Sequence, residues 1–281
     1  MSNGLITLTT DFGLSDHFAG VMKGVILGIA PRARIVDITH EIAPYNLDEA
    51  AFVIAQAWKY FPKGSTHVIV VDPGVGTSRR PILAEAGGHF FIAPDNGVLS
   101  LIYETGPHKV RVLANPKKMR ADISRTFHGR DIFAPAAAHL ASGTKPAAFG
   151  KPIQDYVRSW ITKPSRIADQ VWRGIILKVD RFGNLISNLH IHDFSDIKTS
   201  PFELRIGSQK IRRLALNYAE TEIGEVFAIV GSSGYLEIAA SQSSAEEILR
   251  CSAGTPLELE LFLSEPATVV TMPKRTRARQ K

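Results

Sequence analysis

Cysteine is almost absent from this chain. Its 281 residues include a single cysteine, Cys251, so neither an internal disulfide nor a cysteine-rich zinc site can form. The spacings His-x-x-His and His-Glu-x-x-His do not occur either, and we therefore expect no metal site. A chain with one thiol is typical of a reducing compartment, which predicts a cytoplasmic protein.

Long apolar runs are also missing. The most apolar stretch, Val21 to Ala30, is interrupted by Lys23 and two glycines, and it is far shorter than the roughly 20 residues that a helix needs to cross a bilayer. The first residues do not combine a basic start with an apolar core, so we expect no signal peptide. These two features predict a soluble protein without a membrane partner.

Positive charge is in excess, but mainly at one end of the chain. The net charge is +6, from 33 basic and 27 acidic residues, and five of the basic residues lie within 273–281. Removing those five charges from +6 leaves +1 for the rest of the chain. This distribution indicates a solvated basic tail at 273–281 and gives no support to a specific nucleic-acid surface.

The pattern of apolar residues predicts two domains of different class. Within 1–160 strands and helices alternate, which predicts an α/β domain with a central, mostly parallel sheet flanked by helices. The expected elements are strands at 5–10, 34–38, 67–71, 82–86 and 90–93 and helices at 18–29, 46–60, 98–103 and 131–140. A stretch rich in proline and glycine, 143–170, marks the boundary. Within 170–272 short strands, the last expected at 257–263, predict a small antiparallel β-barrel.

Two carboxylates follow strands of the predicted α/β domain. Asp11 lies in Thr-Thr-Asp-Phe-Gly after the first strand, and Asp72 opens Asp-Pro-Gly-Val-Gly-Thr-Ser-Arg after the third. Ligands of α/β sheets bind outside the carboxyl ends of strands, so both are candidates for one site, although each could instead form a turn. The glycines after Asp72 imitate a nucleotide-binding or methyltransferase loop, but no helix is expected after them and Arg79 stands where that loop needs a glycine.

A third candidate lies at the entrance of a predicted helix. His128 precedes Gly129 in Thr-Phe-His-Gly-Arg-Asp, and a loop position beside a glycine allows its ring to reach into a cleft. The alternative is a structural histidine. His190 and His192 lie two residues apart and would point to opposite sides of an extended segment.

The predicted β-domain has two polar turns. Asp180 and Asn184 flank Arg-Phe-Gly, which indicates either a hairpin turn or an amide that reads a nucleobase edge. The segment from Gly231 to Glu237 follows another strand. It is either a tight turn or a loop whose N–H groups and hydroxyls hold an anion such as a carboxylate.

Taken together, five of these segments resemble one family. They are Thr-Thr-Asp11-Phe-Gly, Asp72-Pro-Gly-Val-Gly-Thr with Arg79, Thr126-Phe-His128-Gly-Arg-Asp-Ile-Phe, Asp180-x-Phe-Gly-Asn184 and Ser232-Ser-Gly-Tyr-Leu-Glu-Ile-Ala. Segments like these occur in this order in adenosine-forming S-adenosyl-L-methionine (SAM) hydrolases, also called SAM hydroxide adenosyltransferases, which are relatives of the SAM-dependent fluorinases and chlorinases. The resemblance covers nearly the whole chain except the basic tail.

The resemblance implies that water attacks the ribose 5′ carbon of SAM in line, giving adenosine and L-methionine without a cofactor or metal. It assigns the catalytic set to Asp72, Arg79 and His128. Asp72 or His128 would accept the proton from water, and Arg79 would stabilise the hydroxide-like charge. Halogenating relatives are similar but have a tyrosine where this chain has Asp72, so the set favours water over halide.

The resemblance also implies the binding residues. Asp11 would hold the ribose hydroxyls and Asn184 the adenine. Asp180 would lie near the methionine ammonium, Ser232 at the methionine end, and Glu237 is a further candidate there. The family is trimeric, so we expect a homotrimer whose sites combine the first domain of one subunit with the second domain of a neighbour. The alternatives are a SAM-dependent halogenase and a non-catalytic protein that binds SAM or adenosine.

Overall fold

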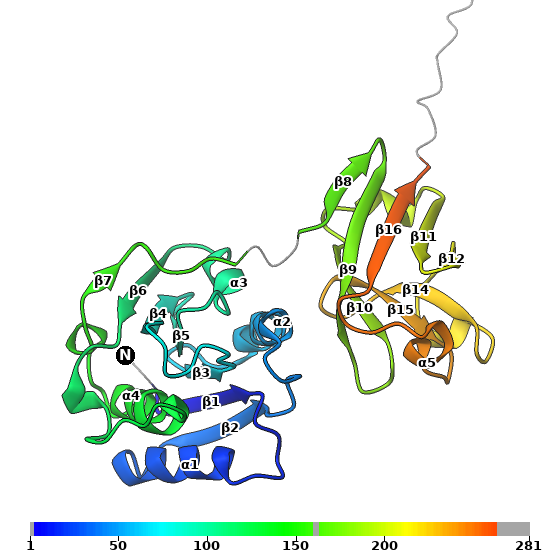
Figure 1. Ribbon diagram of the computed structural model, residues 1–281. Coiled ribbons are helices and arrows are strands. Elements are labelled where there is room, and N and C mark those ends of the chain that lie inside the picture. Colours follow the sequence, from blue (N-terminus) through cyan, green and yellow to red (C-terminus); the bar gives the residue numbers. More distant parts are fainter. Residues whose placement is uncertain (1–2, 160–162, 263–281) are drawn as a thin grey trace, which may run out of the picture. The chain divides into compact units, whose positions relative to one another are not determined.

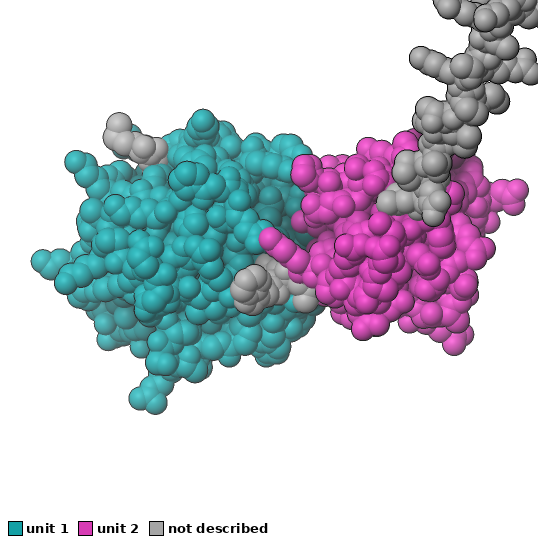
Figure 2. All heavy atoms as spheres, turned by 90° about the horizontal axis from the view of Figure 1, so that it is seen from above, with its two compact units in different colours: residues 1–161 teal, residues 162–281 magenta. Residues whose placement is uncertain are grey.

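The computed structural model describes residues 3–159 and 163–262. The basic tail predicted at 273–281 lies outside the described residues, as does the end of the strand expected at 257–263. The chain forms two compact units, Met1–Ile161 and Thr162–Lys281 (Figures 1 and 2). None of the helices in the described ranges combines the length and the apolar character that crossing a membrane requires.

The first unit is built on a mixed sheet with the strand order β2-β1-β3-β5-β4-β6-β7. Its strands are β1 (Leu5–Thr10), β2 (Arg34–Thr39), β3 (Thr66–Val70), β4 (Pro81–Ala86), β5 (His89–Pro94), β6 (His108–Val112) and β7 (Pro152–Ile153). The pairs β1–β2, β1–β3 and β3–β5 are parallel, but β4 pairs antiparallel with β5 and β6, and β6 does so with β7. The expected mostly parallel sheet is therefore only partly confirmed. One cause is the turn at Gly87 and Gly88, both with positive φ, which folds β4 back on β5.

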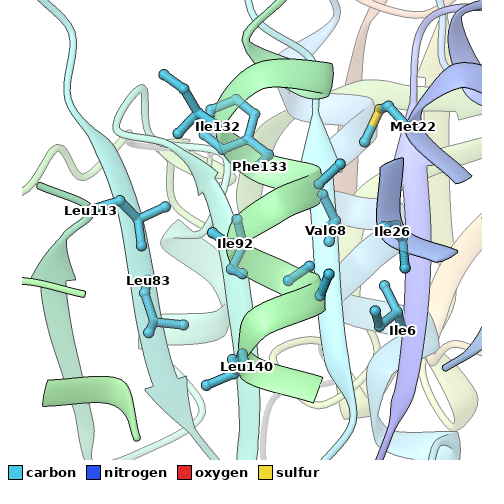
Figure 3. Packing of buried hydrophobic residues seen from close by; sticks show 14 of the residues in the cluster. Ile6, Met22, Ile26, Val68, Leu83, Ile92, Leu113, Ile132, Phe133 and Leu140 are labelled. Carbon is cyan, nitrogen blue, oxygen red and sulfur yellow. The ribbon is translucent and has the colours of Figure 1, made fainter. Parts of the chain in front are cut away.

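Helices cover both faces of this sheet. They are α1 (Phe18–Ile29), α2 (Leu47–Ala57), α3 (Ser100–Tyr103) and α4 (Ala134–Ala141). Alternate residues of β3 enter different cores, because successive side chains of a strand point to opposite faces. Val68 packs with α1 and α4, and Ile69 packs with α2 and α3. Figure 3 shows the first of these cores, where Met22, Ile26 and Phe133 meet the sheet. The unit is thus a three-layer α/β structure.

Two helix ends bear on the predictions. Asn46 caps α2 as expected, because its side-chain oxygen accepts a hydrogen bond from the Glu49 N–H at 3.0 Å. The helix expected at 131–140 begins earlier, with a π-helical turn over Gly129–Phe133 that leads into α4. Such turns are frequent at functional sites, and this one begins directly after His128.

The second unit is a single curled sheet. Its strands are β8 (Ser165–Ala168), β9 (Val171–Val179), β10 (Leu185–His190), β11 (Phe202–Ile206), β12 (Gln209–Ile211), β13 (Leu214–Ala215), β14 (Val226–Val230), β15 (Tyr235–Ala240) and β16 (Pro256–Leu261), with the short helix α5 (Ala245–Leu249). The strand order is β12-β11-β16-β9-β10-β15-β14-β13, with β8 paired to β9. Within the described residues no pairing joins β12 to β13, so the expected barrel is only partly confirmed and the sheet is a curled half-barrel. The pair β13–β14 is parallel, which departs from the expected antiparallel pattern.

Candidate functional site

Three of the predicted site residues line one cavity of the first unit. Asp11 follows β1 and Asp72 lies two residues beyond the end of β3, and these two strands are parallel neighbours. His128 comes from the loop that enters the π-helical turn. Asp11, Asp72 and His128 all border a cavity of about 330 Å³. Asp11 and Asp72, which follow parallel neighbouring strands, therefore border the same cavity at the carboxyl ends of the sheet.

Arg79 connects Asp72 to His128. Its Nε donates to Asp72 Oδ1 at 2.9 Å, and its Nη2 donates to Asp72 Oδ2 and to His128 Nδ1, the latter at 2.6 Å. The side chains of Arg79 and Asp72 are 9% and 5% exposed. A buried carboxylate bound by two parallel N–H groups is held firmly in position, since such charge-assisted pairs are strong and directional.

The contact with Arg79 determines the tautomer of His128. A guanidinium can only donate, so Nδ1 must accept, and the proton of the neutral ring is then on Nε2. Burial, followed by the charge of Arg79, lowers the pKa of His128. Asp72 and Asp131 act in the opposite direction, as does a hydrogen bond with the Ser124 backbone, but the pKa remains lowered. His128 is therefore a neutral imidazole near pH 7.

Asp11 lies beside this set in an environment of its own. Its Oδ2 accepts a hydrogen bond from the Tyr45 N–H at 3.0 Å. Burial raises the pKa of Asp11, the Tyr45 N–H opposes that change, and the charge of Asp72 adds to the increase. Tyr45 has a φ of 66°, a left-handed conformation that costs a residue other than glycine about 1 kcal/mol or more. Tyr45 also lines the cavity. Sequence reasoning missed it, because no residue pattern distinguishes it from an ordinary turn residue.

The loop from Asp72 to Arg79 requires glycine at one position. Gly76 has a φ of +78° and lies so close to the Arg125 carbonyl that a Cβ would collide with it. After its turns the loop enters β4 directly. No helix N-terminus follows the glycines, so the structure does not support the alternative of a nucleotide-binding or methyltransferase loop.

In the second unit, Asp180 organises the turn that contains Asn184. Asp180 Oδ1 accepts hydrogen bonds from the backbone N–H groups of Phe182 (2.8 Å) and Asn184 (2.9 Å). Its Oδ2 accepts from Asn184 Nδ2 at 2.9 Å. The turn-forming role that we gave as an alternative is thus present. The amide oxygen of Asn184 is not used in these contacts.

Glu237 and Tyr218 lie near this turn. Glu237 is a buried residue of β15, and burial followed by the charge of Asp180 raises its pKa. Burial and the charges of Glu237 and Asp180 raise the pKa of Tyr218. Ser232 is exposed in the turn before β15. Tyr218 was not predicted, because its only signal is proximity in space. Among the described residues no cluster of three or more His, Cys, Asp or Glu side chains could hold a metal ion.

Comparisons with known proteins identify the family that the chain resembles over most of its length. Residues 6–150 match the family model described as SAM hydroxide adenosyltransferase N-terminal domain, and residues 174–258 match the corresponding C-terminal domain. An (R)-S-adenosyl-L-methionine hydrolase of Thermus thermophilus is 34% identical over 258 residues, which cover 89% of this chain and 97% of the relative. A fluorinase of Actinoplanes sp. is 28% identical over 277 residues, covering 84% and 91%. The crystal structure of an uncharacterized conserved protein from Thermotoga maritima aligns with a TM-score of 0.84 and 35% identity, covering 91% of this chain and 99% of that one.

Proposed function

Because the chain belongs to the SAM hydroxide adenosyltransferase family, we propose that it is an enzyme that hydrolyses SAM to adenosine and L-methionine. The observation that carries the proposal is the linked set of Asp72, Arg79 and His128 beside a cavity that also contains Asp11. The sulfonium leaves as a neutral thioether, so the leaving group needs no proton. The site has to supply an oxygen nucleophile held in line with the C5′–S bond.

Asp72 is the group that we assign as the proton acceptor. In the tautomer described above, His128 Nδ1 already accepts from Arg79 and Nε2 carries the proton, so the ring offers no free lone pair. Each oxygen of Asp72 accepts one hydrogen bond from Arg79 and keeps further acceptor capacity. The water proton passes to Asp72, the oxygen–C5′ bond forms, the C5′–S bond breaks, and its electron pair remains on the methionine sulfur.

Arg79 would stabilise the developing hydroxide charge. Its Nη1 is buried and has no hydrogen-bond partner among the described residues, so this N–H donor is not already used by another group. His128, which accepts from Nη2, holds the guanidinium in orientation. The geometry of His128 therefore supports a role as the hydrogen-bond acceptor that orients Arg79.

Substrate binding would divide between the two units. Asp11 would accept hydrogen bonds from the ribose hydroxyls, and the free amide oxygen of Asn184 would accept from the adenine amino group. Asp180 and Glu237 would attract the methionine ammonium, with Ser232 nearby. We propose a cytoplasmic homotrimer that uses no cofactor, in which the second unit of one subunit serves the first unit of another. Light scattering on the purified chain tests the trimer.

The reaction is tested with isotope-labelled water. In H₂¹⁸O, attack at C5′ places ¹⁸O in the 5′-hydroxyl of adenosine, and adenosine and methionine form in equal amounts. Mass spectrometry of both products checks this. A purified chain that binds SAM but releases neither product would contradict hydrolysis and indicate a binding protein. A labelled methyl group that leaves methionine would indicate methyl transfer.

The similarity to a fluorinase suggests repeating the assay with halide present. With fluoride or chloride in the buffer, a halogenase would form 5′-halo-5′-deoxyadenosine and less adenosine. A halide has no proton to give to Asp72, so the proposed acceptor assists attack by water and not attack by a halide. We therefore expect the rate of adenosine formation to be unchanged by halide.

A further inference from the structure

The loop that contains Asp72 and Arg79 is held at both ends by two consecutive residues, Asp95 and Asn96, which directly follow β5. We propose that Asp95 and Asn96 are positioning residues that set the geometry of the Asp72–Arg79–His128 set without touching the substrate. This inference rests on the hydrolysis proposed above, and it assigns a catalytic consequence to residues that the family resemblance did not single out.

Asn96 holds the start of the loop. Its Nδ2 donates to the carbonyl oxygen of Val71 at 3.0 Å, and its Oδ1 accepts from the Val98 N–H at 3.2 Å. Val71 directly precedes Asp72 and is fully buried, so its carbonyl would lack water as a replacement partner. The side chain of Asn96 therefore determines where the chain leaves β3 and turns toward the cavity.

Asp95 holds the end of the loop. Its N–H donates to the carbonyl oxygen of Arg80 at 2.8 Å, and its Oδ2 accepts from Arg80 Nε at 3.0 Å and Nη2 at 2.7 Å. Arg80 directly follows Arg79, and the Asp95 side chain is only 3% exposed. Its second oxygen, Oδ1, accepts from the Val157 N–H at 2.8 Å. Both oxygens of this buried carboxylate therefore accept hydrogen bonds from the protein.

Between these two anchors the loop depends mainly on itself. The Val75 N–H donates to the Asp72 carbonyl oxygen at 3.2 Å, and the Thr77 N–H and hydroxyl donate to the Gly74 carbonyl oxygen at 3.2 and 2.7 Å. Internal bonds of this kind preserve the shape of a loop but allow it to move as a body. Displacements of about 1 Å can reduce catalysis on the order of 100-fold. The anchors at Val71 and Arg80 are what prevent such movement.

Two near-isosteric substitutions test the proposal with little change in packing. In Asp95→Asn the single amide oxygen cannot accept from both Arg80 and the Val157 N–H, so one donor faces an NH₂ group. In Asn96→Asp a carboxylate oxygen faces the Val71 carbonyl oxygen. The matched control is Asp155→Asn, because Asp155 binds the same Arg80 guanidinium, at 2.9 and 3.0 Å, but its side chain is 77% exposed.

The measurements are kcat and KM for SAM hydrolysis by the full chain, together with the melting temperature. We expect kcat to fall about 10- to 100-fold in Asp95→Asn and Asn96→Asp, with KM changed less than about threefold. Asp155→Asn should change kcat less than about threefold. If both test variants keep wild-type kcat, the proposal is wrong. If they lose kcat only in proportion to the fraction unfolded, it is wrong as well.

A second readout does not need turnover. NMR titration of the His128 ring, assigned with His128→Gln, reports whether Arg79 still binds Nδ1. Displacing Arg79 should raise the pKa of His128 in Asp95→Asn, whereas this pKa should be unchanged in Asp155→Asn.

The two proposals can fail separately. If the wild-type chain has no turnover, the proposed function is wrong, and the titration alone then tests the positioning role. If Asp95→Asn does not fold, Asn96→Ala, which removes the donor without adding repulsion, takes its place in both measurements. A wild-type His128 pKa in the variant tested would overturn the proposal.

Discussion

The negative charges of the key carboxylates have different partners in the two units. In the first unit Asp72 is bound through both oxygens by Arg79, which also binds the neutral His128. In the second unit Asp180 is held by amide N–H groups, and its negative charge adds to the burial that raises the pKa of Glu237. The first set is neutralised before a ligand arrives, whereas the second keeps negative charge that suits a cationic group. This difference supports the proposed division, with chemistry at the first unit and recognition of the cationic end of the substrate at the second.

The largest effect is expected at Asp72, because we propose that it accepts the proton from water. Asp72→Asn keeps the shape but removes the acceptor, so kcat should fall about 10²- to 10⁴-fold while KM changes little. The control is Glu225→Gln, which breaks the exposed ion pair between Glu225 and Arg213 in the second unit and should leave kcat within about twofold. Steady-state kinetics measure both. A loss confined to KM would show that Asp72 binds substrate, and the contrast between the units would disappear.

Substitution of Glu237 should change KM and leave kcat nearly unchanged, the reverse of the result expected for Asp72. Glu237→Gln removes a buried charge but conserves volume, so the KM for SAM should rise about 10-fold while kcat changes little. Adenosine has no ammonium group, and its Kd should be unchanged in the same variant. Because burial and Asp180 raise the pKa of Glu237, the KM of the wild type should increase as the pH falls, beginning above the ordinary glutamate range. Calorimetry with adenosine and kinetics with SAM check these points. Weaker adenosine binding would place Glu237 at the nucleoside instead.

His67 lies outside the candidate site of the first unit and is expected to affect its stability. Its ring is fully buried between Thr7 Oγ1 at 2.8 Å and His89 Nδ1 at 3.1 Å, and burial followed by His89 lowers its pKa to about 3. The unfolded chain binds this proton near pH 6.5, so the stabilisation is complete above that pH. This contribution to the free energy of unfolding is lost as the pH falls toward 3, by up to about 1.4 kcal/mol per pH unit.

Denaturant unfolding of the wild type and of His67→Gln at several pH values measures this contribution. The variant should be less stable at pH 8 but show a shallower loss on acidification, since carboxylates contribute equally to both chains. Equal slopes would show that His67 is not the group responsible.

The smallest effect is expected from the basic tail. Every residue that we assign to catalysis or binding precedes residue 263, so truncation after Met272 should leave kcat and KM within experimental error. The measurement is the same SAM assay, with the full chain as its control. A loss of activity would mean that the five positive charges at 273–281 belong to the site.

Local features of the fold were predictable from local sequence. The strand at 5–10 and the helix at 18–29 have the expected bounds, because β-branched residues and a helical apolar spacing closed by Pro31 specify them within a few turns of chain. The antiparallel pairing of β4 with β6 and the half-barrel form of the second sheet were not foreseen. Pairing partners such as β4 with β6 lie more than 20 residues apart, and residue periodicity does not reveal which strand will be a neighbour.

The sequence by itself determined the family, the residue types of the candidate site and the separation of a basic tail from a nearly neutral body, since these depend only on which residues are present and in what order. Tertiary structure alone decided that Arg79 joins Asp72 to a neutral His128 across 49 residues, that Asp95 and Asn96 hold the ends of the loop, and that Tyr218 lies near Glu237. The physical reason is that hydrogen bonds and burial act over a few ångströms in space. Only the packed chain brings distant residues within that range and sets the pKa of each group.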